Sequence, residues 1–187
     1  MKKSLLLICL AASIKIQAAV ITGNPGNYTS LVSSLTAGDT LKLNAGTYIG
    51  GLSITNLNGT PSARIVIIGA ASNGSVFEGN ACCNTVSITM SSYVSIYNIK
   101  IDGLGLDIDA VKGEGTSGNW AHHITLDGLW ITRHDNDQQD VGISTKCTAW
   151  DWIIRNCTIN SAGTGMYLGN SDGTAPFVNG IIEHMIS

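Results

Sequence analysis

A repeat of about 28 to 30 residues runs through the chain and constrains its fold more than any other feature. Each copy reads as a short strand with alternating apolar residues, a break, and a second short strand. The copies lie at 65–69, 94–101, 124–131, 152–159 and 180–186. Fixed periods of this length are typical of solenoids, in which each repeat forms one coil and stacks on the next.

The break in each copy is occupied by a residue type that tolerates positive φ. The break residues are Gly69, Asn98, Gly128, Asn156 and His184. We therefore expect the backbone to bend through the left-handed region once per coil, between two strands of different sheets.

Apolar residues two positions before each break predict the core. These are Ile67, Ile96, Leu126, Ile154 and Ile182, whereas alternate residues such as Tyr97, Asp127 and Arg155 should face solvent. A third strand per coil is expected at 86–90, 108–110, 141–143 and 166–168, with variable loops between the strands, above all at 112–121 and 133–140. Three stacked strands per coil predict an all-β, single-stranded parallel β-helix.

The two ends of the solenoid differ. Residues 20–38 form a cap region, because Tyr28, Leu31, Val32 and Leu35 make the stripe of a short amphipathic helix that can cover the first coil. The coils occupy 39–187. Repeat arrays normally end in an atypical polar repeat, and none follows the last strand. We therefore expect the coils to be incomplete and the full-length protein to be monomeric.

The N-terminus carries the pattern of a targeting segment. Lys2 and Lys3 precede an apolar stretch at 5–14, and the small residues Ala18 and Ala19 follow. This pattern predicts a cleavable signal peptide at 1–19 and a secreted or periplasmic protein. The apolar stretch is shorter than the roughly 20 residues that a membrane span needs, and no later segment comes closer.

Export permits disulfides, but the spacing of the cysteines does not decide their pairing. Cys82, Cys83, Cys147 and Cys157 remain after processing. Cys157 occupies a position that other repeats fill with Ile or Leu, which favours a small buried residue over a bridge. For the adjacent Cys82 and Cys83, a loop disulfide to another coil stays open.

Composition excludes two classes of protein. With 44% hydrophobic and 12% charged residues, the chain is unlike a disordered protein. It has 10 Lys and Arg against 13 Asp and Glu, and therefore no basic footprint for nucleic acid.

Two stretches resemble a known superfamily. LTAGDTLKLNAGTY at 35–48 and GGLSITNLNGTPSARIVIIGAASNGSVFEG at 50–79 resemble the opening of right-handed parallel β-helix proteins of the pectate-lyase-like superfamily, closest to alginate-lyase and chondroitinase-B-like polysaccharide lyases and uncharacterised secreted relatives. The resemblance implies the fold and an acidic polysaccharide as substrate. In these lyases a lysine, an arginine and calcium-binding carboxylates come from the middle coils. The pectate-lyase Arg-Pro-Arg loop is absent, since proline occurs only at Pro25, Pro61 and Pro176.

One acidic loop could hold a metal ion. Asp135, Asp137 and Asp140 lie within six residues of one another, together with the amide oxygen of Asn136. Hard oxygen ligands in a flexible loop suit Ca²⁺. The alternative is a solvated polar turn, because Asn and Asp also favour loops through local hydrogen bonds.

A strip of outward-facing residues predicts a substrate groove. Asp107 and Asp109 flank Ile108, so both carboxylates should emerge on one outer face, unless the segment is only a glycine turn leading into a strand. Ser144 and Lys146 on the next coil, and Tyr167 beyond it, should continue this face. The loop indoles of Trp120 and Trp150 could stack on sugar rings.

Lyase chemistry on a uronic acid polymer needs a cation for the carboxylate, a base for the C5 proton and a proton for the leaving oxygen. Lys146, Arg133 and His134 are the catalytic candidates, with Lys112 as a further possible base or acid. We expect a carbohydrate-active protein, a lyase or glycoside hydrolase assisted by Ca²⁺. The alternative is a non-catalytic carbohydrate-binding or surface solenoid, which the absence of a recognisable catalytic motif favours.

Overall fold

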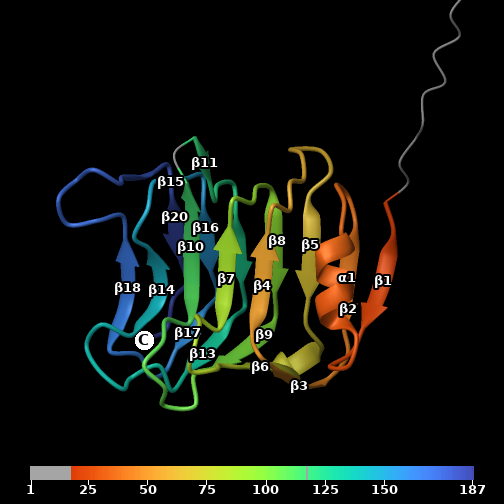
Figure 1. The fold of residues 1–187 in the computed structure, drawn as a ribbon, viewed down its shortest axis with the longest axis horizontal. Helices are drawn as coiled ribbons and strands as arrows, with labels where there is room; N and C mark the ends of the chain where they lie inside the picture. The colour runs from red at the N-terminus through yellow and green to blue at the C-terminus, as the bar shows by residue number, and fades with distance from the viewer. Residues whose placement is uncertain (1–17, 117) are drawn as a thin grey trace, which may run out of the picture.

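The computed structural model describes residues 18–116 and 118–187 (Figure 1). These residues form an all-β parallel β-helix of about five turns with one short α-helix. The fold class predicted from the repeat is therefore confirmed. The signal peptide predicted at 1–19 lies almost entirely outside the described residues.

Each full turn contributes one strand to each of three parallel sheets. The first sheet contains β1 (Val20–Gly23), β2 (Thr40–Leu43), β5 (Ile65–Ile68), β8 (Val94–Tyr97), β12 (Thr125–Asp127), β16 (Ile153–Arg155) and β20 (Ile181–Glu183). The second contains β3 (Gly46–Ile49), β6 (Ser75–Glu78), β9 (Ile99–Asp102), β13 (Trp130–Thr132) and β17 (Thr158–Ile159). The third contains β4 (Leu52–Thr55), β7 (Val86–Thr89), β10 (Val111–Thr116), β14 (Val141–Thr145) and β18 (Thr164–Leu168), which lie side by side in Figure 1. A further pair joins β15 (Ala149–Trp150) to β19 (Phe177–Val178).

The bend between the first and second sheets is left-handed at four of the five predicted positions. Asn98, Gly128, Asn156 and His184 have φ values of 53°, 70°, 52° and 52°. Gly69 is absent from the residues with positive φ, so the expectation of a left-handed bend there is wrong. Glycine is required at this position for another reason, because a Cβ would overlap the carbonyl oxygen of Asn98 on the next coil.

The predicted core ladder stacks inside the coils. Leu41, Ile67, Ile96, Leu126 and Ile154 occupy matching register positions and are fully buried. Ile182 continues this ladder but is 43% exposed, because no strand of the described chain packs beyond it in the first sheet. Burying such a side chain is worth about 1.5 to 3 kcal/mol, so the ladder is a main source of stability.

The third sheet differs from expectation at one coil. The predicted strand at 108–110 is wrong, because the coil uses β10 instead, within the segment expected to be a loop. β10 continues into an antiparallel pair with β11 (Asn119–Trp120). The stretch 133–140 is the expected loop, between β13 and β14.

The cap region contains both a helix and a strand. α1 spans Tyr28–Ser34 and packs against β1, β2 and β4, with Tyr28 and Val32 buried as predicted. Tyr28 Oη donates hydrogen bonds to the carbonyl oxygens of Ile49 (3.0 Å) and Gly51 (2.8 Å). β1 extends the first sheet by pairing with β2. Neither α1 nor the short 3₁₀ helix at Ala71–Asn73, the helices of the described part, has the length and hydropathy of a membrane span.

The cysteines fall into two groups. Cys82 and Cys83 are bonded to each other, which excludes a bridge from either to another coil. Cys147 and Cys157 are buried free thiols, as expected for Cys157. Burial raises the pKa of both thiols to about 11.

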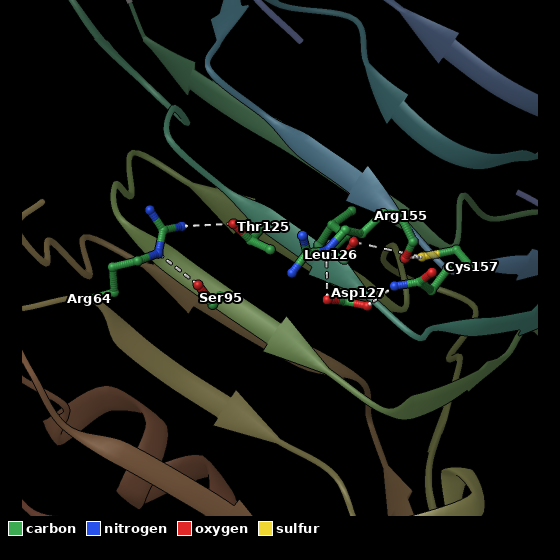
Figure 2. A network of polar contacts seen from close by, with 8 residues as sticks. Arg64, Ser95, Thr125, Leu126, Asp127, Arg155 and Cys157 are labelled. Carbon is green, nitrogen blue, oxygen red and sulfur yellow. Dashed lines mark hydrogen bonds and ion pairs between the residues drawn. The ribbon is translucent and has the colours of Figure 1, made fainter. Parts of the chain in front are cut away.

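Polar side chains connect neighbouring coils along the first sheet (Figure 2). Arg64, which precedes β5, donates from Nε to Ser95 Oγ (2.7 Å) and from Nη2 to Thr125 Oγ1 (3.1 Å). Asp127 and Arg155, predicted to face solvent, are only partly buried and form an ion pair at 2.8 Å. These contacts fix the lateral register of successive coils.

Candidate functional site

The outer face of the third sheet carries one aligned row of side chains. The strand register places Ser53, Ser87, Lys112, Ser144 and Tyr167 beside one another on β4, β7, β10, β14 and β18. Parallel strands lie about 4.8 Å apart, so the row crosses five coils along the solenoid axis. A long polymer could lie along such a face.

A cavity of about 520 Å³ lies beside Lys112, the central residue of this row. Its lining includes the polar and aromatic side chains of Thr89, Lys112, Glu114, Thr116, Trp120, Lys146 and Thr174. Lys112 Nζ lies 3.5 Å from Glu114 Oε1 and 4.0 Å from Asp109 Oδ2. The antiparallel turn from β10 to β11 brings Trp120 to the cavity, because Gly115 pairs with Trp120 across the turn.

A second cavity of about 270 Å³ adjoins the first at Lys146, which lines both. Its other lining residues are Gln138, Gln139, Val141, Thr164 and Tyr167. Lys146 is exposed, and its Nζ lies 5.5 Å from the centroid of the Tyr167 ring, within the range of a cation–π contact. We call the two adjoining cavities the groove. Lys146 stands at its centre, with Lys112 on one side and Tyr167 on the other.

Two of the three predicted catalytic residues lie outside the groove. Arg133 lines neither cavity, and its Nε donates to Asp102 Oδ1 at 2.6 Å. His134 is fully buried, with Nδ1 3.0 Å from the carbonyl oxygen of Ile108. Burial lowers the pKa of His134 below its ordinary value. The expectation that these two side chains lie above the strip with Lys146 is therefore wrong, because the loop turns Arg133 to Asp102 and His134 into the interior.

Three carboxylates converge beside the groove, and they are not the predicted three. One oxygen each from Asp107, Asp137 and Asp140 lies within 4.8 Å of the others. A hydrogen bond to Asp140, together with the negative charges of Asp140 and Asp137, raises the pKa of Asp107. Asp135 is not in this cluster, because it accepts a hydrogen bond from Ser161 Oγ (2.6 Å) instead. The neighbouring loop residues Gln138 and Gln139 line the groove.

Three other residues predicted to contact substrate are buried or lie outside the groove. Asp109 is buried and accepts a hydrogen bond from Val141 N (2.9 Å), so the expectation of an exposed carboxylate is wrong there, and only Asp107 is exposed. Ser144 is in the predicted row but buried. Trp150 lies outside the groove, with its ring stacked on His122 at 4.3 Å between centroids.

Thr89, Glu114 and Thr174 line the groove and were not expected there. Glu114 could have been found from the alternation in 111–115, where Val111 and Gly113 point inward and Lys112 and Glu114 point outward. The glycines conceal this alternation, since they add no apolar signal.

The chain was compared with known proteins. No protein-family profile matches it, and no curated protein matches it by sequence. An alginate lyase from Paenibacillus sp. strain FPU-7 has 23% identity and a TM-score of 0.69, covering 89% of this chain and 57% of the lyase. A mannuronic acid specific polysaccharide lyase of family 6 from human gut microbiota has 17% identity and a TM-score of 0.61, covering 82% and 38%. The pectate lyase Pel9A has 14% identity and a TM-score of 0.52, covering 77% and 48%.

These similarities establish the fold as a parallel β-helix. The chain spans less than two thirds of the length of each of these enzymes. At such identities the likeness concerns the fold, and activity must be argued from the groove.

Proposed function

We propose that this pectate-lyase-like β-helix is a secreted protein that acts on an acidic polysaccharide, as a lyase or a glycoside hydrolase. The observation that carries the proposal is the position of Lys146, which joins two cavities on a face that also presents Lys112. Cations along an extended groove suit a polymer with regularly spaced carboxylates. The structural neighbours named for alginate, mannuronic acid and pectate support this class of substrate.

The groove provides the groups that β-elimination needs. By exchanging its ion pair with Glu114 for the carboxylate of a bound uronate, Lys112 can neutralise that carboxylate and acidify the C5 proton. Lys146 in its neutral form can accept that proton as the elimination begins. The Tyr167 hydroxyl can donate a proton to the departing glycosidic oxygen.

We propose calcium as an aid to this site, held by Asp107, Asp137 and Asp140 rather than by the predicted set. Three converging carboxylates fit a hard divalent cation, and such an ion would relieve the repulsion between their negative charges. A bound Ca²⁺ would supply positive charge beside the groove.

The calcium proposal predicts a change in thermal stability. An ion that binds only the folded state must raise the melting temperature, so calcium should stabilise the chain relative to chelator. Asp107→Asn should remove this response and raise the melting temperature in chelator, because it removes like-charge repulsion. Asp135→Asn is the matched control and should retain the calcium response. Equal melting curves in calcium and chelator would exclude the site.

Secretion is proposed on the N-terminal pattern of residues 1–19. Expression of the full chain in a bacterial host checks it, since the periplasmic or secreted product should lack this segment by intact mass. An unprocessed cytoplasmic product would contradict the proposal.

A non-catalytic, carbohydrate-binding solenoid is the second candidate. The placement of Arg133 and His134 away from the groove favours it, because the groove then contains fewer proton-transferring groups than expected. The two candidates differ in product formation and not in binding.

Incubation with alginate, polygalacturonate and chondroitin sulfate tests the activity. A lyase forms an unsaturated product that absorbs in the ultraviolet, whereas a hydrolase only increases the number of reducing ends. We expect unsaturated product from at least one polymer. Binding without either product would support the second candidate, and the absence of both binding and product would reject the substrate class.

A further inference from the structure

The disulfide between Cys82 and Cys83 occupies an exposed position outside the groove. It lies in a tight turn in which Asn80 and Cys83 form a β-bridge, with Cys83 N 3.3 Å from Asn80 O. A bond between adjacent residues closes a small ring that includes their peptide unit. This ring holds both sulfur atoms in place at the surface.

A cavity of about 310 Å³ lies beside this ring. Its lining consists of Gly50, Leu52, Ser53, Asn80, Cys82, Cys83, Asn84 and Ser87. Ser53 and Ser87 belong to the outward row that continues through Lys112 to Tyr167. The cavity is therefore on the face of the groove, toward the N-terminal end of the solenoid.

The lining combines an apolar surface with polar groups that are free to bind. The sulfur atoms are polarisable and rigidly held. Among the described residues, the side chains of Asn84 and Ser87 and the Nδ2 of Asn80 have no hydrogen-bond partner. No residue of the lining carries a charge. A pyranose ring has the complementary surface, with apolar C–H faces and hydroxyl groups at its edge.

We propose that this cavity is a saccharide subsite, in which one sugar ring packs against the Cys82–Cys83 ring and its hydroxyls bind Asn80, Asn84 and Ser87. The inference rests on the proposed function only for the identity of the polymer that reaches the subsite. It does not require that the protein is catalytic. The covalent ring is already rigid, so packing a sugar against it costs almost no conformational entropy of the protein. The contact between sugar and ring therefore contributes fully to affinity. A polymer held here would extend along the row into the groove, and short oligomers held by the lysines would not reach it.

Calorimetry with oligomannuronates of two and six residues tests the subsite, with neutral mannohexaose as a third probe. The proteins are the oxidised chain, the same chain reduced with a phosphine, and Cys82→Ser/Cys83→Ser, all in a Cys9→Ser background. Cys147 and Cys157 are free thiols, so among the described residues the phosphine can reduce only the exposed Cys82–Cys83 bond. The double variant treated with reductant is the matched control and should not change.

The affinity of the hexamer should fall about tenfold on reduction or substitution, the equivalent of one well-packed apolar contact. The affinity of the dimer should not change. Equal hexamer affinity for all three proteins would overturn the inference and leave the proposed function intact. Loss of mannohexaose binding in the variant, with no binding of either uronate, would support the subsite and reject mannuronate as the acidic sugar. If the oxidised chain bound none of the three probes, the subsite would be overturned, whereas the proposed function would still be decided by polygalacturonate and chondroitin sulfate.

Discussion

At the scale of single residues, a buried carboxylate anchors the end of β9. Asp102 accepts a hydrogen bond from Arg133 Nε (2.6 Å) and one from Leu104 N (3.1 Å), and Lys100 Nζ lies 3.4 Å away. Burial acts to raise the pKa of Asp102, but the hydrogen bonds and the two cations outweigh it and lower the pKa below its ordinary value. Asp102 therefore stabilises the folded chain in its ionised form.

This anchor predicts a pH-dependent stability. A carboxyl group whose folded pKa is lowered contributes stability that is present above its unfolded pKa of about 3.9 and is lost as pH falls through the folded pKa. Asp102→Asn should reduce the free energy of unfolding by about 1 to 3 kcal/mol at neutral pH. Urea denaturation should show this difference shrinking in acid. An equal difference at neutral and acidic pH would contradict the electrostatic account.

Two glycines at equivalent bends should respond differently to alanine. Gly128 has φ of 70°, so Gly128→Ala should cost about 1 to 2 kcal/mol, the penalty of a left-handed residue with a Cβ. Gly69→Ala should cost more, because its Cβ would overlap the backbone of Asn98, which cannot move aside. Denaturant titration of both variants measures which substitution lowers the free energy of unfolding more. A larger loss for Gly128→Ala would be inconsistent with the close contact.

Those bends also show what local sequence can and cannot predict. Left-handed bends at Asn98, Asn156 and His184 follow from residue type, because few residues tolerate positive φ. Position 69 requires glycine because a carbonyl oxygen of the next coil lies too close for a Cβ. The sequence around residue 69 cannot reveal this contact. The pairing of Cys82 with Cys83 likewise depends on the turn that orients the two side chains.

At the scale of elements, β10 shows how packing from another coil conceals a strand. Gly113 takes an inward position in β10, and a Cβ there would lie 2.8 Å from Cζ2 of Trp152. The indole fills the space that an aliphatic residue fills elsewhere, so the apolar alternation disappears from β10. Residues 108–110 are more apolar than β10, so the sequence pattern predicts the strand there instead.

Arg64 shows how one side chain connects three coils (Figure 2). Its Nη2 also donates to the carbonyl oxygens of Val94 (2.9 Å) and His123 (2.7 Å). Arg64→Ala should reduce the free energy of unfolding by about 3 kcal/mol, because it leaves partly buried carbonyl oxygens without donors. Lys42→Ala, at an exposed position of β2, should have little effect. Similar unfolding midpoints for the two variants would show that the network does not hold the coils together.

At the scale of the whole molecule, stacking converts distant residues into one surface. The repeat predicted the parallel β-helix and the row containing Ser144 and Tyr167, because the register of a solenoid follows from its period. The repeat could not predict where the side chains of the 133–140 loop point. Arg133 binds Asp102 and His134 contacts the carbonyl oxygen of Ile108, and neither partner belongs to the loop. The sequence predicts Lys146 and Lys112 as candidates, and the structure places them in one cavity and adds Glu114 beside them.

The rate of product formation by Lys146→Ala, relative to Lys42→Ala, decides whether the groove is the site of reaction. Both variants remove one exposed lysine, but only Lys146 lines the groove. On the polymer that the unchanged chain degrades, Lys146→Ala should lose at least about a hundredfold in turnover, the typical contribution of a general base. Its melting temperature should stay close to that of Lys42→Ala. Equal turnover by the two variants would contradict the assignment of the groove as the site of reaction.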